Sequence, residues 1–241
     1  MKFTLLLSLL VITANVSGFD QRYTTYHHLL AQYVYGGGVA YEKVAQNRDL
    51  ISQISSEFES VTKEEFMSWD EKEQISFLIN SYNFYTIHLI AENLPLKNGV
   101  RDISHPWKKE FVPFLGDTVS LDYVEHDFLR VHYREPRIHF ALVCAAIGCP
   151  ELLDKPFLAT ELDEMLHHAG LLFLNDTSKN RVEKRVMYLS KIFEWYGDDF
   201  KWTHEGGYKE YIREVLQLEN RDYRVRFLDY DWGLNSAKGE K

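Results

Sequence analysis

The chain has 241 residues, of which 45% are apolar and 26% are charged, close to the composition of ordinary globular proteins. This composition excludes a largely disordered or collagen-like chain, and the length is sufficient for one large domain with its own core. The formal net charge of −9 argues against a general nucleic-acid-binding protein, which normally carries a basic face. Aromatic residues make up 15% of the chain, enough to line a site for a flat ligand as well as to fill a core.

The first eighteen residues have the pattern of a secretory signal peptide. Lys2 precedes an apolar run from Phe3 to Val11, and mostly small or uncharged residues follow up to Gly18. The run is shorter than the roughly 20 residues needed to span a bilayer, so we expect cleavage after Gly18 rather than a retained anchor. No later stretch is apolar enough to span a membrane. We therefore expect an exported mature protein, secreted or periplasmic.

Helical patterns dominate the segment that follows. Apolar and aromatic residues recur at helical spacing over residues 20–35, and three glycines at 36–38 then interrupt the helix. A second helix is predicted for residues 41–58. Thr62 and Glu65 form the signature of a capping box at the start of a further short helix.

A long helix is predicted from Asp70 to Asn93, before a proline. Apolar side chains cover nearly all of its sides, which is typical of a helix buried at the centre of a domain. Asn80 and Asn83 lie on its flank, and buried amides require hydrogen-bonding partners. The two amides either hold the backbone of a loop or belong to a polar binding site.

Strands and shorter helices are predicted in the second half. A hairpin is expected at residues 110–121, and Ser120 can cap a helix that extends to about residue 131. The segment 145–157 is predicted to be a loop. Further strands are predicted at residues 137–144, 181–189 and 224–228, and further helices at 160–174, 190–196 and 208–218.

These elements predict an α+β fold, a single compact domain with a central buried helix, a small mixed or antiparallel sheet and helical N-terminal decoration. The predicted parts of the chain are a signal peptide at 1–18, a helical extension at 19–62, the main domain at 63–235 and a disordered tail at 236–241.

Several strings of residues occur together in a fixed order. They are FLINSYN at 77–83, SLDYVEH at 120–126, PRIHFALVC at 136–144, GCP at 148–150, SKIFEWY at 190–196 and YDWGLN at 230–235. This combination resembles the family catalogued as domain of unknown function 547 (DUF547), over roughly residues 65–235. The chain differs from residues common in that family at Leu78, Phe84 and Val143, where Trp, Ala and Asn are common. The family name implies no established activity, so predictions of function rest on the chemistry of the residues.

Cys149 and His139 are the candidate catalytic pair. His139 lies in the predicted strand at 137–144, and Cys149 lies in the loop after it, where it can return towards the imidazole. A histidine can activate a thiol as a thiolate nucleophile, and a third group then orients the imidazole. We favour Asp231 for the third role, with Asp199 or an amide of the central helix as alternatives. This arrangement predicts a hydrolase or acyl-transfer enzyme.

The same cysteines are candidates for a disulfide. Two cysteines in an exported protein often pair with each other, and a strand end and the next loop can bring the Cα atoms of Cys144 and Cys149 within about 6 Å. A disulfide would remove the free thiol that catalysis needs. The protein would then be a non-catalytic envelope or extracellular binding module for a small molecule, peptide or glycan. A redox-active pair is a third alternative.

Glu125 and His126 are candidate binding residues on the helix that follows Ser120. Glu125 can form a charge-assisted bond to Arg137 or to His139, either as a structural ion pair or within a site.

Trp195 and Trp232 belong to an aromatic group near the C-terminal end, which either packs in the core or forms a platform for a peptide or glycan. No pattern of histidine, cysteine and acidic residues has the spacing of a metal site, so we expect neither a metal nor a cofactor.

Overall fold

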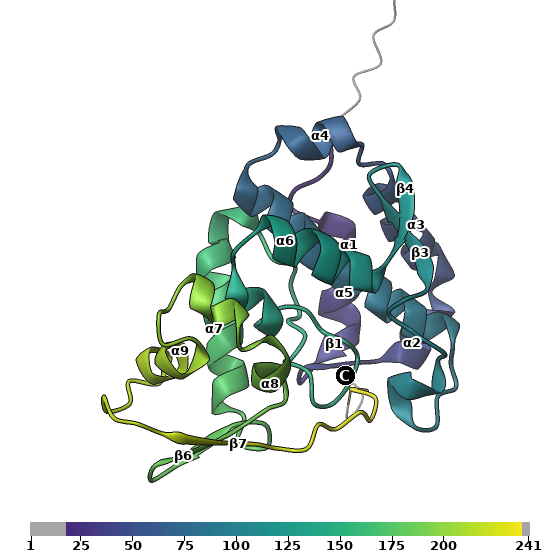
Figure 1. Ribbon diagram of the computed structural model, residues 1–241. Coiled ribbons are helices and arrows are strands. Elements are labelled where there is room, and N and C mark those ends of the chain that lie inside the picture. The colour runs from purple at the N-terminus through teal and green to yellow at the C-terminus, as the bar shows by residue number, and fades with distance from the viewer. Residues whose placement is uncertain (1–17, 238–241) are drawn as a thin grey trace, which may run out of the picture.

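The computed structural model describes residues 18–237, and the helix α5 (Glu71–Glu92) lies at its centre (Figure 1). The helices α7, α8 and α9 lie on one side of α5, and α2 and α3 lie on the other. The fold is therefore α+β with a central buried helix, as predicted. The predicted signal peptide, apart from Gly18, lies outside the described residues.

The N-terminal segment forms a helix and a small hairpin. The helix α1 (Thr24–Tyr33) is followed by the antiparallel strands β1 (Val34–Tyr35) and β2 (Gly38–Val39). Gly36 and Gly37 form the turn with φ angles of 58° and 72°, a conformation that favours glycine. The predicted interruption of the helix is thus confirmed as a tight turn.

Two helices replace the single one predicted at 41–58. They are α2 (Tyr41–Gln46) and α3 (Arg48–Glu59). Asn47 separates them, and its side-chain oxygen accepts a hydrogen bond from the backbone N–H of Leu50, at 3.4 Å. Asparagine is a favoured N-cap, so this residue begins a new helix where the apolar pattern alone continues.

Side-chain caps begin the next two helices. The Thr62 hydroxyl accepts the Glu65 backbone N–H at the start of α4 (Lys63–Ser68). The Glu65 carboxylate accepts the backbone N–H of Phe19. Asp70 begins α5 with a complete capping box. Nearly every residue of α5 from Ile75 onward is buried, which confirms the central position predicted from its apolar sides.

Aromatic rings join the N-terminal helices to α5. Phe58 of α3 contacts the rings of Phe77 and Phe84, with centroids 5.5 and 5.6 Å apart. Phe19 contacts Phe77 at 5.4 Å, and Tyr26 contacts Phe84 at 6.0 Å. Residues 19–62 therefore share the core of the central helix.

A hairpin and an unusual helix follow α5. The strands β3 (Glu110–Phe114) and β4 (Asp117–Ser120) pair as predicted. The Ser120 hydroxyl accepts the backbone N–H of Tyr123, which confirms the predicted cap. The helix that it begins is π-helical over η2 (Tyr123–Leu129) and ends in α6 (Arg130–His132). Such wider turns occur frequently at functional sites.

The prediction of a strand at residues 137–144 is wrong. Residues Pro136–Phe140 form a 3₁₀ turn, η3. At its start the backbone N–H of Arg137 donates to the Glu135 carboxylate. Proline favours the first turn of a helix because its φ is already fixed. A short apolar run is compatible with either a buried strand or a buried helical turn, so periodicity did not separate them. The other 3₁₀ turns are η1 (Gly99–Asp102), η4 (Ala159–Glu161) and η5 (Asp199–Trp202).

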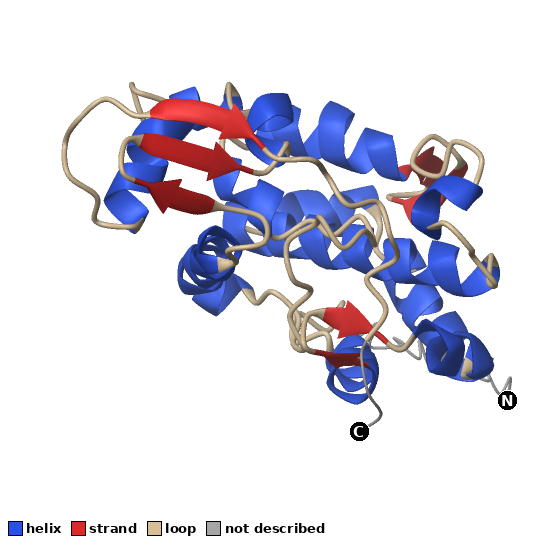
Figure 2. Cartoon of the chain, turned by 90° about the horizontal axis from the view of Figure 1, so that it is seen from below, coloured by secondary structure: helices blue, strands red, loops and turns tan. Residues whose placement is uncertain are grey.

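A mixed three-stranded sheet lies at one end of the molecule (Figure 2). The predicted strand at 181–189 is a hairpin of two strands, because Lys184 turns the chain with a φ of 54°. The central strand pairs antiparallel with one neighbour and parallel with the other. The strands are β5 (Arg181–Glu183), β6 (Val186–Leu189) and β7 (Arg224–Phe227), and the remaining helices are α7 (Leu162–Asn175), α8 (Ile192–Tyr196) and α9 (Tyr208–Val215).

The C-terminal segment, residues 230–237, returns across the loop that holds the cysteines. The backbone N–H groups of Ile147 and Gly148 donate to carbonyls of residues 233 and 231. A Cβ atom at Gly148 would lie 3.0 Å from the Tyr230 ring, so a larger residue here would require the ring to move by a few tenths of an ångström. Residues 236 and 237 then pair with Val39 of β2, so the predicted tail is ordered at these two residues, and 238–241 lie outside the described part. Within residues 18–237, no helix is both long enough and apolar enough to cross a membrane.

Candidate functional site

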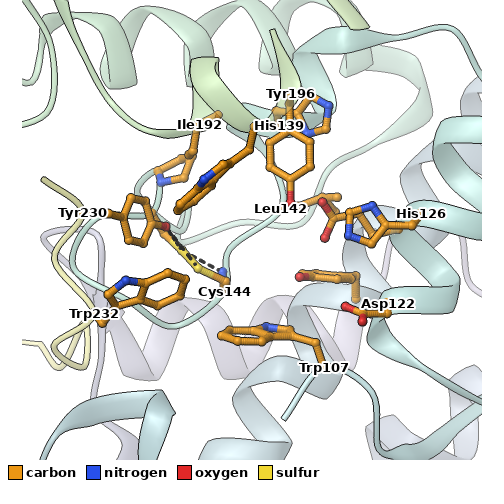
Figure 3. A pocket seen from close by; sticks show the side chains of 15 residues that line it. Trp107, Asp122, His126, His139, Leu142, Cys144, Ile192, Tyr196, Tyr230 and Trp232 are labelled. Carbon is orange, nitrogen blue, oxygen red and sulfur yellow. Dashed lines mark hydrogen bonds between the residues drawn. A yellow bond between two sulfur atoms is a disulfide. The ribbon is translucent and has the colours of Figure 1, made fainter. Parts of the chain in front are cut away.

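A cavity of about 280 Å³ opens where η2, the cysteine loop, α8 and the C-terminal segment meet (Figure 3). Figure 3 shows Tyr230 and Trp232 on one side of it and His126 and Asp122 on the other. Most of the predicted site residues reach this cavity. The side chains that line it are Tyr82, Trp107, Asp122, Glu125, His126, His139, Leu142, Cys144, Cys149, Pro150, Ile192, Trp195, Tyr196, Tyr230 and Trp232.

Four rings form what we call the aromatic wall, namely Trp107, Trp195, Tyr230 and Trp232. The ring centroids of Trp195 and Tyr230 are 4.9 Å apart, and those of Tyr230 and Trp232 are 4.7 Å apart. Trp107 extends the wall, 5.9 Å from Trp232. Trp195 remains 45% exposed, which is unusual for a ring that only packs a core.

Two carboxylates, Asp122 and Glu125, form what we call the acidic wall. Glu125 is only 7% exposed, and the hydroxyls of Tyr82 and Tyr196 hydrogen-bond to it. Burial, together with the Glu125 charge, raises the pKa of both phenols, so both stay protonated and donate. Burial also raises the pKa of Asp122, and the nearby Glu125 charge contributes to that rise.

A separate ion network lies behind the cavity. Arg130 binds Asp199 through two parallel hydrogen bonds of 2.7 and 2.8 Å, and His139 Nε2 lies 2.8 Å from Asp199 Oδ2. Burial opposes ionisation of Asp199, but the hydrogen bonds from His139 and Arg130 outweigh it and lower the pKa of the carboxyl to about 2. Asp199, and not Asp231, therefore orients His139.

The two cavity histidines are held in defined positions. The His139 ring stacks on Tyr196, with centroids 4.1 Å apart, as Figure 3 shows. His126 Nδ1 lies 3.0 Å from an Arg130 nitrogen. Because an arginine can only donate, His126 Nδ1 must accept, and its hydrogen is then on Nε2. His126 and Arg130 are four residues apart on the same helical segment, which places their side chains on one face.

The sulfur atoms of Cys144 and Cys149 lie at disulfide bonding distance, and their Cα atoms are 6.2 Å apart. The backbone N–H of Cys144 donates to Cys149 Sγ at 2.9 Å, and the Tyr230 hydroxyl donates to the same sulfur at 3.2 Å (Figure 3). Of the predicted alternatives, the structure contains the disulfide. Among the described residues no hydrogen bond joins Cys149 to His139.

The two amides of α5 hold backbone rather than the cavity. Asn80 accepts from the Phe157 N–H and donates to the Phe157 carbonyl, at 2.9 and 2.8 Å. Asn83 accepts from the Val143 N–H and donates to the Ala141 carbonyl at the same distances. Both amides are buried and have partners at both ends, so they fix the loops before and after the cysteines.

Two further predicted residues lie outside the cavity lining. Arg137 pairs with Glu135 and Asp163, so Glu125 binds neither Arg137 nor His139, contrary to expectation. Asp231 is exposed, and its carboxylate accepts the Gly233 backbone N–H. The predicted role of Asp231 is therefore not observed, because His139 on the turn η3 contacts Asp199, one of the alternatives, instead.

Several cavity residues were missed in the sequence. Asp122 lies one helical turn before Glu125, which was a usable signal. The sequence gives no signal that Tyr82 or Trp107 faces the cavity. Tyr82 lies on α5, which is apolar on nearly all sides, and Trp107 lies in a loop. Within residues 18–237, no three histidine, cysteine or acidic side chains converge as they would around a metal ion.

Comparison with known families matches the part of the chain that supplies ten of the fifteen residues lining the cavity. Residues 66–174 match the model of a family described as "Protein of unknown function, DUF547". The chain contains a DUF547 domain. No curated protein and no solved structure matches the chain significantly. The DUF547 match includes α5, η2 and both cysteines, whereas α8 and the C-terminal segment, which complete the aromatic wall, lie beyond it.

Proposed function

We propose that this DUF547 protein is a ligand-binding module whose cavity holds a small organic group, either free or as part of a peptide or glycan. The observation that carries the proposal is the aromatic wall facing the acidic wall across a cavity of about 280 Å³. A concave site with several rings and a few convergent polar groups is typical of a small-molecule site. The half-exposed Trp195 leaves a ring available for stacking.

The disulfide supports a binding role because it fixes the floor of the cavity. It joins the two ends of the loop at 144–149, and the C-terminal segment pairs with the same loop. A site held in its bound shape loses less conformational entropy when the ligand binds. A pair of sulfurs at disulfide distance also supports our proposal that the protein is exported to an oxidising compartment.

A hydrolase or acyl-transfer enzyme that uses Cys149 is the second candidate. Two donors, the Cys144 N–H and the Tyr230 O–H, point at Cys149 Sγ. In the reduced protein these donors could hydrogen-bond to a thiolate, the form of cysteine that attacks. This candidate requires the disulfide to be opened first, whereas the binding role does not.

The test compares binding by the oxidised and reduced protein. A library of small organic fragments is screened against both by ligand-observed NMR, with Trp195→Ala as the cavity variant. Trp202→Ala is the matched control, because Trp202 is also partly exposed but does not line the cavity. We expect the oxidised protein and the Trp202→Ala variant to bind the same fragments, and the Trp195→Ala variant to lose them.

Two other outcomes contradict the binding module. Failure of the oxidised protein to bind any fragment would reject it. Turnover of ester fragments by the reduced protein alone, abolished by alkylation of Cys149, would establish the hydrolase instead. Export has its own test, since N-terminal sequencing of the protein from its native host should begin at Phe19, and a retained Met1 contradicts it.

A further inference from the structure

We propose that the ligand carries an ammonium group, which lies between the aromatic wall and the carboxylates of Asp122 and Glu125. This inference depends on the proposed binding function and names the ligand class for the same cavity. It follows from the charges of the lining, from the partners of Glu125 and from the chemistry of the rings.

The acidic side chains of the cavity lining have no basic counterpart there, because its two histidines have partners inside the protein, His126 in Arg130 and His139 in Asp199. The lining includes two carboxylates and neither a lysine nor an arginine. His126 Nδ1 accepts a hydrogen bond from Arg130, so this nitrogen offers no hydrogen to a ligand. An anionic ligand would be repelled by Asp122 and Glu125, whereas a cation would be attracted to both.

Glu125 is the most informative group, because its charge is buried without a counter-charge. Its carboxylate receives hydroxyl hydrogen bonds from Tyr82 and Tyr196. Among residues 18–237 no lysine, arginine or histidine lies within salt-bridge distance of it. Burying a charge is costly unless the charge is paired, and hydroxyls supply hydrogen bonds but no positive charge. A ligand cation would supply the missing charge.

The nearest arginine does not fill this role. Arg130 influences Glu125 through space, but its guanidinium binds Asp199 through two nitrogens and His126 through the third. All three of its side-chain nitrogens thus have partners other than Glu125. The positive charge near Glu125 is already used to neutralise Asp199.

The aromatic wall has the chemistry that ammonium groups prefer. The faces of tryptophan and tyrosine rings attract cations, and cages of such rings bind quaternary ammonium ligands. Trp232 already shows this property, because the Arg101 guanidinium lies 4.2 Å from its ring centroid. In the described part of the chain no arginine or lysine lies over Trp107, Trp195 or Tyr230, so these three rings have no such cation of their own.

The experiment separates charge from shape. Choline, tetramethylammonium and Nε-trimethyllysine are titrated into the oxidised protein, and tryptophan fluorescence reports occupancy of the aromatic wall. The matched neutral probe is 3,3-dimethylbutan-1-ol, which has the shape of choline without its charge, and N-acetylglucosamine represents a neutral sugar. We expect choline to bind about tenfold or more tightly than its neutral isostere, and added salt to weaken it.

Variants then test whether the carboxylates of the acidic wall cause the preference for a charged ligand. Glu125→Gln and Asp122→Asn should each weaken choline binding several-fold and leave the affinity of the neutral isostere unchanged. Asp127→Asn is the matched control, since Asp127 lies on the same π-helical segment, is exposed and does not line the cavity. Thermal unfolding of each variant confirms that it is folded. If Glu125→Gln does not fold, Asp122→Asn still tests the assignment.

Three outcomes overturn the inference. Equal affinity for choline and its isostere would show that shape alone matters. Binding of N-acetylglucosamine but of no ammonium probe would reject the cation and keep the binding module. No binding of the three ammonium probes up to tens of millimolar would reject the cation as well, and the fragment screen then decides separately whether the cavity binds anything.

Discussion

Asp199 and Glu125 are both buried, with exposed fractions of 4% and 7%, but their partners differ. Asp199 receives hydrogen bonds from Arg130 and His139, and both partners carry or can carry positive charge. Within residues 18–237, the hydrogen-bonding partners of the Glu125 carboxylate are tyrosine hydroxyls. Burial of a carboxylate therefore does not by itself identify a binding site. A carboxylate paired within the protein holds the fold, whereas one that lacks a counter-charge is available to a ligand.

The Asp199 network is structural because it joins separate elements. Arg130 lies on α6, His139 on η3 and Asp199 on η5, so three segments far apart in the sequence meet at one carboxylate. Glu125 also joins separate elements, since it lies on η2 and its partners Tyr82 and Tyr196 lie on α5 and α8. These partners are neutral hydroxyls, so their hydrogen bonds lose less stabilisation than an ion pair does when the carboxylate charge is removed.

Replacement of Asp199 should therefore have the largest effect on the free energy of unfolding. In Asp199→Ala the Arg130 and His139 side chains lose their partner in a buried place, and we expect a loss of about 3–5 kcal/mol in the free energy of unfolding. Urea denaturation measures it. Asp198→Ala is the control, because Asp198 is exposed and pairs only with Lys201, and it should change stability by less than about 1 kcal/mol. A loss of that small size in Asp199→Ala would remove the distinction between the two carboxylates.

Acid should remove the same stabilisation without a mutation. The pKa of Asp199 is lowered from 3.8 to about 2 in the folded protein, so its contribution is complete above pH 5 and is lost as the pH falls towards 2. This difference in pKa corresponds to roughly 2 kcal/mol. We expect the stability advantage of the wild-type chain over Asp199→Asn to shrink by that amount between pH 5 and pH 2, in urea titrations at each pH. An advantage that is independent of pH would contradict this.

Glu125→Gln should have the smallest effect on stability. Glutamine keeps an oxygen that accepts a tyrosine hydroxyl, and the variant no longer buries a charge without a counter-charge. We expect a change of less than about 1 kcal/mol in the free energy of unfolding, of either sign. Thermal and urea unfolding at pH 7 measure it. Destabilisation as large as that of Asp199→Ala would show that Glu125 is structural as well, and would sharpen the comparison in the opposite direction.

Much of the fold was predictable where one local signal was sufficient. The apolar sides of α5 indicated a central helix, and Asp70, Thr62 and Ser120 marked where three helices begin. Prediction from the apolar pattern failed where two different local structures are compatible with the same pattern. The apolar run at 137–144 is compatible with a strand and with the observed turn, and Asn47 interrupts a helix whose apolar spacing continues through it.

The candidate site was predicted as a set of residues more successfully than as a set of contacts. Cys144, Cys149 and His139 do meet at one cavity, together with both predicted tryptophans. Asp199 was one of several candidate partners of His139, and the sequence could not choose among them because the direction of the ring depends on whether residue 139 lies on a strand or a turn. Trp107 reaches the cavity from a loop, and no spacing rule indicates where a loop side chain points.

The pairing of residues 231–235 with the cysteine loop has a consequence for synthesis of the chain. Tyr230 and Trp232 enter the cavity only through this pairing, more than 80 residues after Cys149. A nascent chain that has not yet released these residues from the ribosome already contains both cysteines, but it has neither the Tyr230 hydroxyl beside them nor a complete aromatic wall. The cavity is therefore assembled at the end of translation, and a chain truncated before residue 230 would lack it even if its helices had folded.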